Sequence, residues 1–189
     1  ALAGGCDYIL FGGDSYSHNY ISDDDYKYAA ALCHDANVPV YIAMPRILSQ
    51  SQMKFIDTVL NGIDCADFAG VYAHTLGQIK RISDICRQMG ISLPITADFS
   101  MNTFNNAAIA ALEDINVQAA VLSPELNMQQ IKAVAANSAM PLEIIVQANI
   151  ELMVSEYCVI GSFLGNLHKG SCSAPCKQGN FYLRDRKNE

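Results

Sequence analysis

Three cysteines near the carboxyl end of the chain have the residue type and spacing of metal ligands. Cys158, Cys172 and Cys176 lie in one stretch punctuated by glycine and proline. Such a stretch favours a loop, and a loop can turn several thiolates toward one ion. Thiolates of this kind hold zinc or an iron–sulfur cluster, and both groups normally take a fourth ligand. The alternative is three free thiols on a surface loop. His168 lies between the cysteines and is a candidate fourth zinc ligand, with a solvated histidine as the alternative.

A second group of candidates follows the expected strands, where the chemistry of a (β/α) barrel takes place. His74 and Asp98 follow two of these strands and are candidate catalytic residues, together with Glu125. The alternatives are a structural histidine and, for Glu125, a carboxylate that complements the dipole of the next helix. Capping of the next helix is the alternative role for Asn102 and Asn105. The candidate substrate-binding residues are Arg46, Asn102, Asn105, Ser123, Gln147 and Glu151.

No motif in the sequence selects a proteolytic nucleophile. The chain contains neither Gly-x-Ser-x-Gly nor His-Glu-x-x-His. Ser100 and Ser123 are both conceivable partners of His74, since nucleophilic catalysis needs a hydroxyl beside a base. Nothing in the sequence chooses between them.

A regular alternation of strands and helices positions these residues. Short β-branched runs predict six strands, at residues 7–11, 38–44, 67–73, 93–98, 117–122 and 142–147. Each run is apolar almost throughout, which is typical of parallel strands buried on both faces. Helices are predicted between them at residues 26–36, 52–60, 76–89, 107–112 and 128–136. Their expected N-caps include Ser22, Ser49 or Ser51, and Thr75.

The repeated strand–helix unit predicts an α/β fold. No Gly-x-Gly-x-x-Gly follows a strand, which weakens a nucleotide-binding open sheet. We therefore expect an incomplete TIM-like (β/α) barrel over residues 1–157. Residues 158–189 are expected to form the cysteine-bearing loop and the start of a C-terminal extension.

Composition restricts the class of protein. The chain has 189 residues, is 51% hydrophobic and carries a net charge of −7, which argues against a general nucleic-acid coat. No stretch is apolar for long enough to span a bilayer and no signal-peptide pattern is present. Seven cysteines, an odd number, are expected to be reduced thiols, so the expected location is cytoplasmic. Because the chain begins at Ala1 without Met, we expect it to be a piece of a longer protein.

Several segments resemble the U32 peptidase family, the collagenase-like proteases. They are Gly5-Cys-Asp-Tyr-Ile-Leu-Phe-Gly-Gly13, Ala97-Asp-Phe-Ser-Met-Asn-Thr-Phe-Asn105, Leu122-Ser-Pro-Glu-Leu126, Pro141-Leu-Glu-Ile-Ile-Val-Gln147, Glu151-Leu-Met-Val-Ser-Glu-Tyr-Cys158, Cys172-x-x-x-Cys176 and Phe181-Tyr-Leu-Arg-Asp-Arg186. The resemblance covers essentially the whole chain. It implies a TIM-barrel-like catalytic domain that here lacks the first and the last strand of the family. The strands that start at Asp7 and Leu142 are then expected to border an open edge, which a second copy in a homo-oligomer would cover.

The resemblance implies two kinds of activity. Members were first described as proteases, whereas other relatives act in oxygen-independent hydroxylation of RNA or of the ubiquinone ring. Some of those relatives hold a 4Fe-4S cluster through cysteines that match Cys158, Cys172 and Cys176, and many have a further cysteine where this chain has Glu151. The substrate is then a polypeptide, an RNA or a small aromatic molecule. A non-catalytic scaffold or binding module with a structural zinc site is the third hypothesis.

Overall fold

The computed structural model describes residues 1–14, 21–150, 155, 157–166 and 172–182. These residues belong to two compact units. The first contains residues 1–14 and 21–147, and the second contains the described part of 148–189. Within the described residues, no helix has both the length and the apolar character that a membrane span needs.

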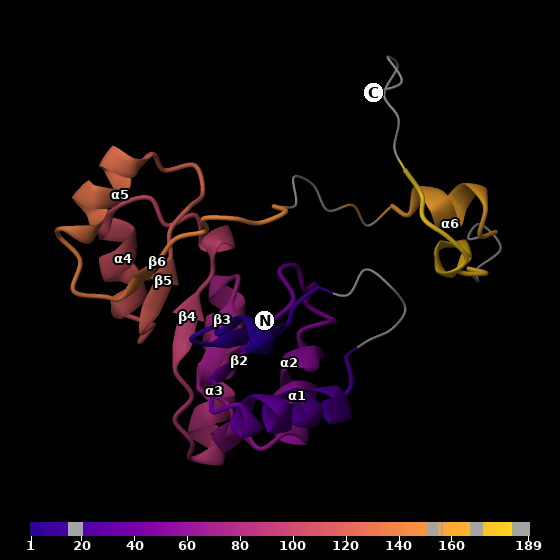
Figure 1. The fold of residues 1–189 in the computed structure, drawn as a ribbon, viewed down its shortest axis with the longest axis horizontal. Helices are drawn as coiled ribbons and strands as arrows, with labels where there is room; N and C mark the ends of the chain where they lie inside the picture. The colour runs from indigo at the N-terminus through magenta and orange to yellow at the C-terminus, as the bar shows by residue number, and fades with distance from the viewer. Residues whose placement is uncertain (15–20, 151–154, 156, 167–171, 183–189) are drawn as a thin grey trace. The chain divides into compact units, whose positions relative to one another are not determined.

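The first unit is a curled sheet with helices on its outer side, an incomplete α/β barrel (Figure 1). Its described residues form six parallel strands that pair in the order of the chain. They are β1 (Ile9–Gly12), β2 (Val40–Ala43), β3 (Gly70–Ala73), β4 (Ile95–Ala97), β5 (Ala119–Val121) and β6 (Leu142–Glu143). The predicted fold class is therefore confirmed. Among the described strands β1 and β6 each have one neighbour, as the resemblance implied for the strands that start at Asp7 and Leu142.

Five helices follow the strands in turn: α1 (Asp23–Asp35), α2 (Lys54–Gly62), α3 (Leu76–Met89), α4 (Asn106–Glu113) and α5 (Met128–Ala135). Short 3-10 turns lie at η1 (Leu2–Gly4), η2 (Cys65–Asp67) and η3 (Phe99–Met101). The second unit contains α6 (Val159–Phe163) and η5 (Pro175–Lys177). In the half-barrel, α1 contacts β1 and β2, while α3 contacts α2 and β3.

Capping residues fix where several helices begin. The hydroxyl of Ser22 accepts the N–H of Asp25 and the Asp25 carboxylate accepts the N–H of Ser22, a reciprocal capping box at the start of α1. Thr75 caps α3 by accepting the N–H of Gln78. The predicted cap of the second helix is wrong, because α2 begins at Lys54 and its N-cap has no side-chain hydrogen bond.

The two faces of the sheet have different chemistry because strand residues alternate in direction. The outward face packs against the helices and forms the core. That core includes Ile42, Val71 and Ala97 from the strands and Ile79 and Ile82 from α3. The inward face is more polar, since the register aligns Tyr72 of β3 with Thr96 of β4, and the alternation then directs His74 and Asp98 to the same face.

We expect substitution of Ile82 by alanine to lower the free energy of unfolding by about 2–5 kcal/mol, because this fully buried side chain would leave a cavity under β3. Urea denaturation measures the change. The matched control is Leu76→Ala on the same helix, where the side chain is exposed and the change is expected to stay within about 0.5 kcal/mol. Equal effects of the two substitutions would contradict this core.

Candidate active site

His74 and Asp98 meet at the carboxyl ends of two neighbouring strands. His74 follows β3 directly, Asp98 follows β4 directly, and the N–H of Asp98 donates to the carbonyl of Ala73 at 2.9 Å. The Nε2 atom of His74 lies 3.3 Å from Oδ2 of Asp98. On the other side of the ring, Nδ1 lies 3.0 Å from the hydroxyl of Ser100. A carboxylate and a hydroxyl thus lie beside the two ring nitrogens of one imidazole.

Burial determines the protonation of this pair. Only 9% of the surface of His74 is exposed, and desolvation lowers its pKa despite the neighbouring carboxylates of Asp98 and Asp14. Desolvation also raises the pKa of Asp98, against the opposing effect of the His74 charge. Both shifts favour the uncharged forms of the two side chains.

Neighbouring residues hold the His74 backbone in place. The side chain of Gln78, which is completely buried in α3, accepts the N–H of His74 at 2.7 Å and donates to the carbonyl of Pro45 at 2.7 Å. The amide thereby joins the carboxyl ends of β2 and β3. At the adjoining strand end, the N–H of Arg46 donates to Oδ1 of Asp14 at 3.0 Å. The charge of Arg46 lowers the pKa of both His74 and Asp98.

A carboxylate on β6 and two tyrosines form a second cluster on the inner face. Tyr72 donates to Oε1 of Glu143 at 2.6 Å, and Tyr8 donates to Oε2 of the same residue at 3.0 Å. The ring of Tyr41 makes edge-on contacts with both tyrosine rings. Burial raises the pKa of Tyr72 well above that of a free phenol. The charge of Glu143 contributes to the raised pKa of Asp98, which connects the two clusters electrostatically.

Within the described residues, the structure does not bring the remaining sequence candidates to the His74–Asp98 pair as a group. Asn105 is the N-cap of α4, whereas Asn102 ends η3 in the left-handed region and does not cap α4. Glu125 is exposed in a turn, and because α5 begins three residues later with Asn127 as its cap, the predicted position at the helix start is wrong. Ser123 is buried and its hydroxyl accepts the N–H of Glu125 at 3.4 Å. Gln147 is exposed. Glu151 and His168 lie outside the described residues.

The sequence did not select the role of Ser100 and did not identify Asp14 or Glu143 as site residues. The alternating direction of strand side chains could have indicated Glu143, since the register pairs it with Val121 and so places it on the inner face. Ser100 carries no such signal, because it lies in the short turn η3 rather than in a strand.

Two of the three candidate metal ligands approach a common space in the second unit. A Cβ atom added to Gly161 would lie 3.2 Å from the sulfur of Cys158 and 3.4 Å from that of Cys172. Both sulfurs accept backbone N–H groups, from Gly161 at 3.2 Å and from Ala174 at 3.3 Å. Within the described residues, however, no three His, Cys, Asp or Glu side chains are grouped as a metal site, so Cys176 does not join the other two.

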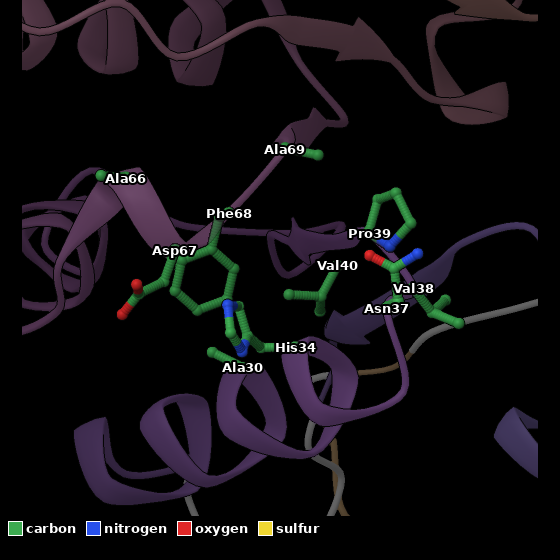
Figure 2. Close-up of a pocket in the computed structure, with 10 residues that line it drawn as sticks. All are labelled: Ala30, His34, Asn37, Val38, Pro39, Val40, Ala66, Asp67, Phe68 and Ala69. Carbon is green, nitrogen blue, oxygen red and sulfur yellow. The ribbon is translucent and has the colours of Figure 1, made fainter.

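A separate hollow lies at the opposite ends of the strands. It has a volume of about 340 Å³ and is lined by residues that precede β2 and β3 and by the last turns of α1. Figure 2 shows mainly apolar side chains around it, including Val40, Pro39 and Phe68, with the carboxylate of Asp67 pointing away from Val40 and Pro39. In (β/α) barrels this end generally serves stability, whereas active sites occupy the carboxyl ends of the strands, the end at which His74 and Asp98 lie.

The model of peptidase family U32 matches residues 1–189. The chain belongs to this family. A U32 relative, the uncharacterized protease MJ0090 of Methanocaldococcus jannaschii, is 24% identical over 159 residues, which are 80% of this chain and 36% of that protein. The chain therefore spans about a third of the length of this relative.

The fold of this U32 chain also resembles a solved structure. The U32 peptidase Mk0906 aligns with a TM-score of 0.54 at 12% identity, over 73% of this chain and 60% of that one. At this identity the likeness concerns the fold. Both comparisons agree with the sequence resemblance and with the incomplete barrel.

We expect Tyr72→Phe to lower the free energy of unfolding by about 1.5–3 kcal/mol, because the buried phenol donates to a charged group and phenylalanine keeps the ring. The matched variant Tyr8→Phe removes the more exposed donor to the same carboxylate and should cost less than about 1 kcal/mol. Urea titrations of both variants check the order. A larger loss for Tyr8→Phe would contradict the proposed importance of burial.

Proposed function

We propose that this U32 chain carries the acid–base centre of a peptidase, with His74 as the proton-transferring group. The observation that supports this function is the buried contact of His74 Nε2 with Asp98 Oδ2 at 3.3 Å, at the end of the barrel where such enzymes perform chemistry. Membership of a peptidase family supports a peptide as the substrate.

The surroundings suit this task. Because burial lowers the pKa of His74, its imidazole stays neutral at lower pH than an exposed histidine and is available as a base. Asp98 orients the ring, while its own second oxygen is held by the N–H of Phe99 at 2.5 Å. Gln78 fixes the backbone of His74. Substrate-binding roles for Arg46 and Asn102, beside the carboxyl ends of β2 and β4, are part of the same proposal.

We expect His74→Gln to lower kcat/KM for cleavage of fluorescein-labelled casein by about 10²–10⁴-fold. For the unaltered protein, kcat/KM should rise with pH as the His74–Asp98 pair loses its shared proton, and then level off. The direction follows because only unprotonated imidazole accepts a proton. Asp98→Asn should keep a rise with pH but move it to lower pH, because the imidazole still titrates and the carboxylate charge that raises the pKa of His74 is gone.

The matched control is His34→Gln, which is exposed on α1 and lies at the opposite ends of the strands from His74. This variant should cleave at the original rate. Full activity of His74→Gln, or an equal loss in His34→Gln, would contradict the proposed centre.

A second candidate function is favoured by the two sulfurs that face one space. Cys158 and Cys172 would hold a thiophilic metal or a 4Fe-4S cluster, and Cys176 would have to move toward them to serve as a third ligand. A side chain at Gly161 would contact both sulfurs, so glycine at this position leaves the space between them unfilled. Bound there, a cluster would supply the electron transfer that oxygen-independent hydroxylation of RNA or a small aromatic molecule requires. The chain's own residues would fix the sulfurs through the N–H groups of Gly161 and Ala174.

Iron and sulfide analysis of protein purified without oxygen tests this second function. We expect a brown protein whose iron is lost in Cys158→Ser and in Cys172→Ser, because each substitution removes a thiolate. Cys6→Ser, in the other unit, should keep its iron. Zinc without iron would favour the scaffold with a structural zinc site, and absence of both metals would leave the peptidase function alone.

A further inference from the structure

We propose that Ser100 is a nucleophile that forms an acyl-enzyme with the substrate carbonyl. The inference rests on the acid–base role proposed for His74 and Asp98, and it adds a covalent step to that role. Its support is the position of the Ser100 hydroxyl on the side of the imidazole ring opposite to Asp98.

The three groups have the order of a nucleophile, a base and an orienting acid. The hydroxyl oxygen of Ser100 lies 3.0 Å from His74 Nδ1, and His74 Nε2 lies 3.3 Å from Asp98 Oδ2. Both distances are within the reach that activation of a nucleophile requires. Compared with the familiar Ser-His-Asp arrangement the two ring nitrogens exchange roles, which leaves the chemistry unchanged because either nitrogen of a neutral imidazole can accept a proton.

Local structure explains why the three groups meet. Asp98 is the N-cap of η3, and Ser100 is the middle residue of that turn, so the acid and the hydroxyl lie on one tight segment. Asn102 ends the turn at φ 52°, in the left-handed region that asparagine tolerates. His74 reaches them from β3, whose last residue Ala73 pairs with Ala97 of β4.

The proposed nucleophile is more exposed than the proposed base. Ser100 and Asp98 are partly exposed, whereas His74 is buried beneath them. A substrate carbonyl can therefore approach the hydroxyl while the base stays shielded from water. Shielding strengthens the electrostatic effect of Asp98 on the imidazole.

The positions of the protons on Ser100 and on the His74–Asp98 pair distinguish an inactive form of the site from an active one. The hydroxyl of Ser100 carries one proton and has two acceptors, Nδ1 of His74 at 3.0 Å and the carbonyl of the same residue at 3.1 Å. When the His74–Asp98 pair holds its extra proton, Nδ1–H donates to the hydroxyl oxygen and the hydroxyl donates to the carbonyl. Loss of that proton leaves Nδ1 free to accept from Ser100, while Nε2–H donates to Asp98. The nucleophile is activated in this second form.

The proposed covalent reaction needs no reactant other than the substrate and water. The Ser100 oxygen bonds to the substrate carbonyl carbon as its proton passes to His74 Nδ1. The carbon–nitrogen bond then breaks, and the leaving amine takes that proton. Water next attacks the ester and gives a proton to Nδ1, and the Ser100 oxygen leaves and recovers the proton. The net reaction is hydrolysis of one amide bond.

Labelling with a fluorophosphonate tests the nucleophile directly, because an activated serine displaces fluoride and keeps the phosphonyl group. We expect one adduct per chain, located at Ser100 by peptide mass spectrometry. Ser100→Ala should form none, and His74→Gln should form it at least about 10²-fold more slowly. The control Ser138→Ala, altered where the hydroxyl donates to the carbonyl of Met140, should label like the unaltered protein. No adduct, or an adduct on another serine, would overturn the proposal.

The variant Ser100→Cys provides a measurement that a purely structural hydroxyl would not affect. Its thiol should react with iodoacetamide at lower pH than an ordinary thiol, because His74 accepts the thiol proton. The control Ser138→Cys should show the ordinary pH profile, and His74→Gln added to Ser100→Cys should restore that profile. Identical profiles for the two cysteine variants would overturn the activation by His74. Circular dichroism of each variant identifies one that fails to fold.

The outcomes separate this inference from the proposed function. If His74→Gln abolishes casein cleavage but Ser100 forms no adduct, then the pair activates water and the nucleophile proposal alone fails. If Ser100 is labelled but casein is not cleaved, then the nucleophile stands and the peptide substrate fails.

Discussion

The hydrogen bonds from Tyr8 and Tyr72 to Glu143 depend on one constraint, the curl of the six-stranded sheet. Tyr8 immediately precedes β1, whereas Glu143 ends β6, and these are the two outermost described strands. A flat sheet would hold them five strand spacings apart, at about 4.8 Å each. Their contact therefore requires strong curvature about the inner face.

The contact between Tyr8 and Glu143 also shows that the strands are staggered. Continuing the registered pairs along the inner face places Asp14, His74, Asp98, Val121 and Glu143 in one row. Tyr8 lies six residues before Asp14 in the sequence, yet it reaches Glu143. A barrel of eight strands with shear 8 shifts the register by about one residue per strand, so five steps explain most of this offset. Curl and stagger together bring distant polar residues to one face.

The parts of the candidate site that depend on strand position, His74 and Asp98, could be predicted from the sequence. Each predicted strand exists, and His74 and Asp98 were selected because they follow strands. The strands are shorter than predicted, most clearly at β6, which contains Leu142 and Glu143 but not residues 144–147. Ser100 was not selected because its approach to His74 depends on the geometry of η3, which no periodicity encodes. The cysteine spacing indicated a shared centre, and the structure brings Cys158 and Cys172 together but not Cys176.

The buried amide of Gln78 has a mechanical consequence. By bonding to the N–H of His74 and the carbonyl of Pro45, it makes the start of α3 and the ends of β2 and β3 a single stiff joint. Motion at the carboxyl ends of the strands is then expected in segments other than this joint. The neighbouring turn η3 ends at Asn102, whose φ of 52° lies in the left-handed region that asparagine tolerates. A displacement of this turn would move Ser100 relative to the imidazole of His74, and would so change the 3.0 Å distance between the hydroxyl and Nδ1 on which the proposed covalent step depends.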